Sequence, residues 1–186
     1  RYQEAERFFL EALEICKRLA KENPEAYEPT LANFLNNRAL LLRHIGRYQE
    51  AEEMYREALE IMRKLAEKNP RAYEPNLATC LNNLAKLLYN IGHYQEVEEI
   101  YREVLEIRQK LAQETPGAYE PGLANSLNGL ACLLEDIGRH QEAEEMHRQA
   151  LEIRRKLAEK NPDAYEPDLA ISLNSLACLL EATGHY

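Results

Sequence analysis

The sequence predicts an all-α fold, a solenoid of about eight helices stacked as antiparallel pairs. Three observations support it. A segment that opens with a glycine at Gly46 returns in edited form at Gly92 and Gly138 and begins again at Gly184, so the period is 46 residues. The prolines recur with the same period, and the apolar residues between them follow helical spacing. A fixed period of this size is typical of stacked repeats in which each unit contacts only its neighbours.

We expect one solenoid over residues 1–186, with the helix after each proline pair named A and the helix after each glycine named B. The predicted order is therefore B-A-B-A-B-A-B-A. The chain then consists of helix B of an incomplete unit (1–23), three full units (24–69, 70–115 and 116–161) and helix A of another incomplete unit (162–186).

All eight prolines belong to four copies of Pro-x-Ala-Tyr-Glu-Pro. Because proline breaks helices beyond their first turn, we predict that each copy is a connector between helix B and the next helix A. The tyrosine of each copy is then expected to fill the gap between stacked units. The four copies contain Pro24, Tyr27 and Pro29; Pro70, Tyr73 and Pro75; Pro116, Tyr119 and Pro121; and Pro162, Tyr165 and Pro167.

Helix A and helix B each carry a recognisable apolar face. In the second full unit, helix A places leucines at i, i+4, i+7 and i+11, from Leu77 to Leu88, and Gly92 follows as the expected C-cap. The apolar stripe of helix B consists of Val97, Tyr101, Val104, Leu105 and Leu111. The opposite face carries Glu-to-cation pairs at i, i+4, which support helicity: Glu52/Arg56, Glu60/Lys64, Glu98/Arg102, Glu106/Lys110, Glu144/Arg148 and Glu152/Lys156.

Composition excludes several classes of partner. A net charge of −9 disfavours binding to nucleic acid or to an anionic membrane surface. No apolar run approaches the roughly 20 residues of a membrane-spanning helix, and no signal peptide is visible. The four cysteines, Cys16, Cys80, Cys132 and Cys178, fit no metal motif or disulfide framework, so we expect reduced thiols and a cytoplasmic location.

No catalytic motif is present, and we expect no enzyme, no cofactor and no metal. The chain lacks a phosphate-binding glycine loop, a His-Glu-x-x-His segment and a nucleophile elbow. Its five histidines are His44, His93, His140, His147 and His185. His140 and His147 lie seven apart where other units have aromatic residues, and no Asp or Cys joins them at ligand spacing. We therefore expect them to be polar-tipped core residues.

Helix B and its lead-in resemble the tetratricopeptide repeat, which has small and aromatic residues at set offsets from a turn glycine. The segment Leu81-Asn82-Asn83-Leu84-Ala85 is similar to the kinesin light chain variety and to repeats of prokaryotic signalling proteins. The usual repeat is about 34 residues long, shorter than the 46 found here. The matching positions are Tyr48, Ala51, Tyr55 and Ala58; Tyr94, Val97, Tyr101 and Val104; His140, Ala143, His147 and Ala150; and, in helix A, Ala39, Ala85, Ala131 and Ala177.

The resemblance implies a right-handed superhelix whose A helices line a concave groove that binds a protein or a linear peptide. It implies a peptide-binding surface made of Asn33, Thr79 and Asn125; Asn36, Asn82, Asn128 and Asn174; Asn37 and Asn83; Leu40, Lys86, Cys132 and Cys178; and Arg43, Tyr89 and Glu135. The second group, asparagine in every unit, is called the asparagine ladder below. Asparagine amides suit binding to peptide backbone, but the ladder could instead hold neighbouring units together, and both readings stay open.

Two further expectations concern charge and association. Arg38, Arg43, His44 and Lys86 lie in the first two units and Glu135, Asp136 and Glu181 in the last two, which suggests a partner with an acidic and a basic end. The first and last helices lack their neighbours, which predicts head-to-tail self-association. The alternative to peptide binding is therefore a structural, oligomerisation or regulatory array within a larger signalling protein.

Overall fold

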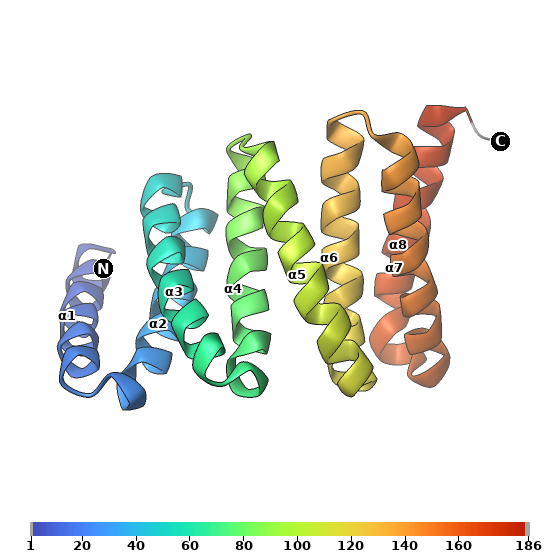
Figure 1. The fold of residues 1–186 in the computed structure, drawn as a ribbon. Helices are drawn as coiled ribbons and strands as arrows, with labels where there is room; N and C mark the ends of the chain where they lie inside the picture. Colours follow the sequence, from blue (N-terminus) through green and yellow to red (C-terminus); the bar gives the residue numbers. More distant parts are fainter. Residues whose placement is uncertain (1, 185–186) are drawn as a thin grey trace. The chain divides into compact units, whose positions relative to one another are not determined.

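A computed structural model describes residues 2–184 and the side chains of residues 4–184. Eight α-helices and no strand occur within that range, which confirms the predicted all-α fold (Figure 1). Arg1, His185 and Tyr186, which belong to the repeat, lie outside the described residues. The helices are α1 (Tyr2–Glu22), α2 (Pro24–His44), α3 (Tyr48–Lys68), α4 (Pro70–Asn90), α5 (Tyr94–Glu114), α6 (Pro116–Asp136), α7 (His140–Lys160) and α8 (Pro162–Thr183).

The chain divides into two compact units, residues 1–87 and 88–186, with the boundary inside α4. From here on, "first unit" and "second unit" mean these two parts of the chain and not single repeats. In the first unit α1 packs on α2, and α2 packs on α3. In the second unit α5 packs on α6, α6 on α7, and α7 on α8. Consecutive helices are antiparallel because tight turns join them, as the α6–α7 pair shows (Figure 1). The predicted alternation of B helices (α1, α3, α5, α7) and A helices (α2, α4, α6, α8) is confirmed.

The predicted proline connectors are wrong, because these segments form the first turns of the A helices. Helix α2 begins at Pro24. Proline is tolerated there because an N–H in the first turn would have no acceptor within the helix. Pro29 lies inside the helix. The same holds for α4, α6 and α8. A single extended residue joins each B helix to the next A helix. At the first junction this residue is Asn23, with φ −142°, and its Oδ1 accepts a hydrogen bond from the Ala26 N–H at 3.3 Å.

The glycine turns are as predicted. Gly46, Gly92, Gly138 and Gly184 have φ of 80°, 83°, 78° and 72°, a region that L side chains rarely adopt. After α2, the Arg47 N–H donates to the Leu42 carbonyl at 2.9 Å, which closes the turn around Gly46. This turn needs one glycine and almost no linker, so each helix B is placed directly against the helix A that precedes it.

The predicted apolar faces are buried. Leu77 is 6% exposed, whereas Leu81, Leu84 and Leu88 are fully buried. All five residues of the predicted helix B stripe in α5 are also buried. The predicted i, i+4 ion pairs of Arg56, Lys64, Arg102, Arg148 and Lys156 are formed, at N–O distances from 2.6 to 2.8 Å. Over residues 2–184 no helix has the length and apolar character needed to cross a membrane.

Candidate functional site

The residues expected to bind a peptide differ widely in exposure. Eight of them are exposed, seven are half-buried and one is buried. Exposed are Asn33, Asn37, Thr79, Lys86, Asn125, Cys132, Asn174 and Cys178; half-buried are Asn36, Leu40, Arg43, Asn83, Tyr89, Asn128 and Glu135; buried is Asn82.

The asparagine ladder makes contacts between neighbouring A helices. In the first unit, the Asn83 Nδ2 of α4 donates to the Asn36 Oδ1 of α2 at 3.1 Å. In the second unit, the Asn128 Nδ2 of α6 donates to the Ser172 Oγ of α8 at 3.2 Å. Asn82 is 6% exposed. Three of the four ladder asparagines therefore lie inward, which is what a role in holding the stack requires.

In the second unit, the buried Arg154 and the half-buried Arg108 of the B helices form hydrogen bonds to neighbouring A helices. Arg154 of α7 is 5% exposed, and burial lowers its guanidinium pKa below the ordinary value. It donates to the Asp168 carbonyl at 2.9 Å, to Ser172 Oγ at 2.6 Å and to Asn125 Oδ1 at 2.7 Å. Arg108 of α5 makes the equivalent bonds to Gly122 O and Ser126 Oγ. These hydrogen bonds compensate for the loss of water around the two guanidinium groups, whose burial would otherwise be costly.

The first unit has apolar residues where the second has this arginine–serine pair. Met62 and Cys80 occupy the positions, 46 residues earlier, of Arg108 and Ser126. Both are buried, and the Cys80 Sγ contacts the Tyr55 carbonyl at 3.8 Å. The repeat therefore accepts either an apolar pair or a hydrogen-bonded polar pair at this position.

Several charges proposed to recognise a partner already have partners within the chain. Arg38 forms an ion pair with Glu6, and its guanidinium lies 4.2 Å from the centre of the Phe9 ring. Tyr89 donates its hydroxyl hydrogen bond to Asp136, and this bond, together with burial, raises the pKa of the phenol above its usual range. The charge that a partner would meet is smaller than the sequence suggests.

The two histidines of α7 have different environments. His140 is exposed and is not the core residue that the sequence predicts, whereas His147 is fully buried, as predicted. The His147 Nδ1 lies 3.2 Å from Asn128 Oδ1, and its Nε2 lies 2.5 Å from Glu135 Oε1.

Cys132, Glu135 and His147 form a cluster that spacing along the chain did not reveal. Their ligand atoms lie within 4.8 Å of one another. Although Cys132 is exposed as a residue, partial burial of its thiol, followed by the neighbouring Glu135 and Asp136 carboxylates, raises the pKa of that thiol. Cys132 and Glu135 are three residues apart on α6 and share a face, while His147 comes from the antiparallel α7. In the sequence, the i, i+3 spacing of Cys132 and Glu135 was the available signal for this cluster. Only the packing of α7 against α6 brings His147 to the pair.

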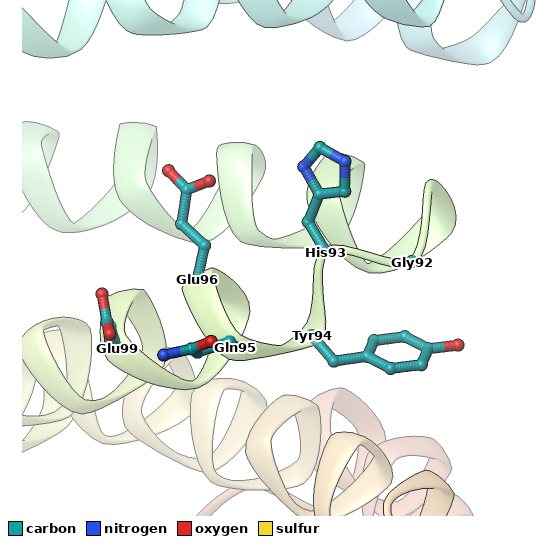
Figure 2. A pocket seen from close by; sticks show the side chains of 6 residues that line it. All are labelled: Gly92, His93, Tyr94, Gln95, Glu96 and Glu99. Carbon is teal, nitrogen blue, oxygen red and sulfur yellow. The ribbon is translucent and has the colours of Figure 1, made fainter.

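A hollow lies at the turn between α4 and α5, within the second unit. Gly92, His93, Tyr94, Gln95, Glu96 and Glu99 line it (Figure 2). His93 and Glu96 extend toward the same side, whereas Tyr94 extends away from them (Figure 2). The hollow is open and formed mainly by one turn, so its groups do not converge on a ligand.

Comparison with known proteins identifies the family. The tetratricopeptide repeat matches residues 1–64, 30–110 and 109–156. The chain belongs to the tetratricopeptide repeat family. Family membership indicates a protein–protein interaction scaffold. No curated protein sequence matches the chain.

Solved structures show the same fold. BtubC (BKLC) from P. vanneervenii is 28% identical, with a TM-score of 0.77 over 98% of this chain and 66% of that one. TPR-like repeats assigned to a kinesin light chain from Podosopora anserina are 24% identical, with a TM-score of 0.65 over 84% and 68%. The apo form of RapI is 19% identical, with a TM-score of 0.70 over 100% and 47%. The chain thus spans just under two thirds of BtubC and less than half of RapI.

Proposed function

We propose that this tetratricopeptide chain binds an extended peptide through the exposed polar side chains of its A helices. The observation that carries the proposal is that Asn33 and Asn37 of α2 and Asn174 of α8 are exposed although asparagine is a weak helix former. Their amides can donate to and accept from peptide backbone. The proposal includes no chemical reaction.

The inward asparagines have a different task in this proposal. Asn36 and Asn128 hold neighbouring A helices, and the exposed amides contact the partner. Substituting Asn82 or Asn128 would therefore disturb the stack and confuse loss of binding with loss of structure. Binding is better tested at Asn33 and Asn37, for which the structure describes no hydrogen bond.

The test is a random-peptide display selection against the wild-type chain, followed by affinity measurement on two variants. The first variant is Asn33→Ala/Asn37→Ala, and the matched control is Gln49→Ala/Gln109→Ala, which removes two exposed amides from B helices. We expect the first variant to weaken binding of an enriched peptide at least about tenfold, equivalent to about 1.4 kcal/mol. The control should bind as the wild type does. Equal affinities for both variants, or no enriched motif, would contradict the proposal.

Self-association is a second candidate function, favoured by exposed apolar residues on α1 and α8. Leu173 of α8 is 43% exposed, yet Leu127 and Leu35, at the same position of earlier A helices, are 2% and 0% exposed. Phe8 and Ile15 of α1 are 55% and 43% exposed. We propose that these faces join two copies head to tail. In sedimentation velocity, the wild type should associate as its concentration rises, and Leu173→Glu should abolish this association. A wild-type mass that stays that of a monomer at all concentrations would contradict the proposal.

A further inference from the structure

The cluster of Cys132, Glu135 and His147 contains three different metal-binding side chains from two helices. His147 is fully buried, Glu135 is half-buried and Cys132 is exposed. A tetrahedral Zn²⁺ site with bonds of about 2.0–2.3 Å places its ligand atoms about 3.3–3.6 Å apart. The three ligand atoms lie within 4.8 Å of one another, so side-chain movements of about 1 Å would bring them to that geometry.

The hydrogen bonds around His147 aim its Nε2 at the cluster. The Asn128 Nδ2 donates to Ser172 Oγ, so the other end of the amide, Oδ1, accepts from the Nδ1–H of His147. When Nδ1 carries the only ring proton, the Nε2 lone pair faces the cluster, and Nε2 lies 2.5 Å from Glu135 Oε1. Metal-binding histidines are usually oriented in this way, with the second ring nitrogen donating to an oxygen acceptor.

At 2.5 Å, His147 Nε2 and Glu135 Oε1 are at hydrogen-bond distance, and a metal ion that replaced this bond would require the two atoms to separate by about 1 Å. A divalent metal ion would use the nitrogen, the oxygen and the sulfur together. The exposure of Cys132 leaves a fourth position open to solvent, as in sites with three protein ligands.

Among the described repeats, the three ligands coincide once. The positions equivalent to Cys132, Glu135 and His147 are occupied by Leu40, Arg43 and Tyr55 in the α2–α3 pair, and by Lys86, Tyr89 and Tyr101 in the sequences of α4 and α5. Helix α8 has Cys178 and Glu181 at the same positions, but no helix follows it within residues 2–184.

We propose that Cys132, Glu135 and His147 bind a divalent metal ion of the Zn²⁺ class. A thiolate, an imidazole and one carboxylate match Zn²⁺ and its neighbours in the first transition row, whereas Ca²⁺ and Mg²⁺ prefer sites made of oxygen ligands. Binding releases the thiol proton of Cys132 to solvent, since the thiolate is the ligand. The site includes Cys132 and Glu135 of the surface expected to bind a peptide, but the proposal does not rest on peptide binding.

The test is a titration of the reduced protein with Co²⁺, a spectroscopic substitute for Zn²⁺, followed by displacement with Zn²⁺. We expect one Co²⁺ per chain, a thiolate-to-Co²⁺ charge-transfer band, and loss of that band when Zn²⁺ is added. Cys132→Ser should abolish the band and weaken binding at least about tenfold. His147→Phe, which places at this position the residue type that Phe9 has in the first repeat, should do the same.

Cys178→Ser is the matched control, because Cys178 has the same position in the next A helix and is also exposed. It should leave both the band and the stoichiometry unchanged. Cys132 is exposed, so the fold of the Cys132→Ser variant is not in question; the thermal melt of metal-free His147→Phe checks the other variant. The proposal is overturned by absence of Co²⁺ binding, by a band that survives Cys132→Ser or disappears in Cys178→Ser, or by one Co²⁺ for two chains.

Discussion

Two glycines of α6 should respond in opposite ways to the same substitution. Gly122 and Gly129 both lie inside the helix, where alanine is favoured over glycine by about 1 kcal/mol. A methyl group added at Gly122 would meet the Arg108 side chain at 3.5 Å, an ordinary contact distance. A methyl group added at Gly129 would lie 2.5 Å from the hydroxyl oxygen and 2.6 Å from Cζ of Tyr101.

The two effects at Gly129 do not cancel. Tyr101 is 3% exposed, so its ring cannot move away without disturbing the packing around it. Because the added methyl group would lie within 2.8 Å of three Tyr101 atoms, we expect a cost in the upper part of the range of about 1–3 kcal/mol for overpacking, which exceeds the helix-propensity gain of about 1 kcal/mol. We expect Gly122→Ala to raise stability by about 0.5–1 kcal/mol and Gly129→Ala to lower it by about 1–2 kcal/mol. Melting temperatures should then differ by roughly 3–12 °C, at about 2–4 °C per kcal/mol for a chain of this size.

Thermal unfolding followed by circular dichroism measures this difference, and a second background identifies its cause. Tyr101→Leu removes the distal ring atoms, so Gly129→Ala should become neutral or stabilising when made in that variant. If Gly129→Ala were as stable as Gly122→Ala in the wild-type background, or equally harmful with and without Tyr101, the packing argument would be refuted.

Three other predictions concern buried groups. Arg154→Met alone should destabilise by about 2–4 kcal/mol in denaturant unfolding because it leaves polar groups unpaired, whereas adding Ser172→Cys should restore most of this loss, and no recovery would contradict the argument. Burial raises the pKa of Cys80 and of Tyr55 to about 12, so the unfolded chain releases these protons first. The unfolding free energy should therefore fall from about pH 9 to pH 12, and less steeply in Cys80→Ala; equal slopes would argue against it. Asn36→Ala should cost about 1 kcal/mol of stability through loss of its hydrogen bond, and a neutral result in the same assay would argue against a packing role.

The proline segments and the histidine cluster show where sequence-based prediction failed. The proline pairs predict connectors, but Pro24 begins α2 and Pro29 lies within it, where the loss of one N–H donor does not end the helix. The cluster at His147 escaped because its ligands come from facing helices. Spacing along a chain reports neighbours within one helix and does not report which side chains meet across a pair.

The exposure of the candidate binding surface was equally inaccessible to sequence. Asn82 is the equivalent of Asn36, so Asn82 and Asn37 occupy adjacent positions of the repeat. Both belong to the surface that the sequence predicts to line the groove. Asn82 is buried, whereas Asn37 is exposed. One residue along a helix rotates a side chain by about 100°, so the choice between contact with the next repeat and contact with a partner depends on how adjacent helices pack.

The sequence by itself determined the repeat length, the all-α class, the glycine turns, the apolar faces and the family. These features follow from local rules, since helical periodicity, capping and left-handed glycine geometry act within a few residues. Only the tertiary structure decided which asparagines turn inward, which oxygens accept hydrogen bonds from Arg154 and which groups surround His147. Those outcomes depend on distances between helices that lie far apart along the chain, and the free energy of burying a polar group depends on the partners it finds there.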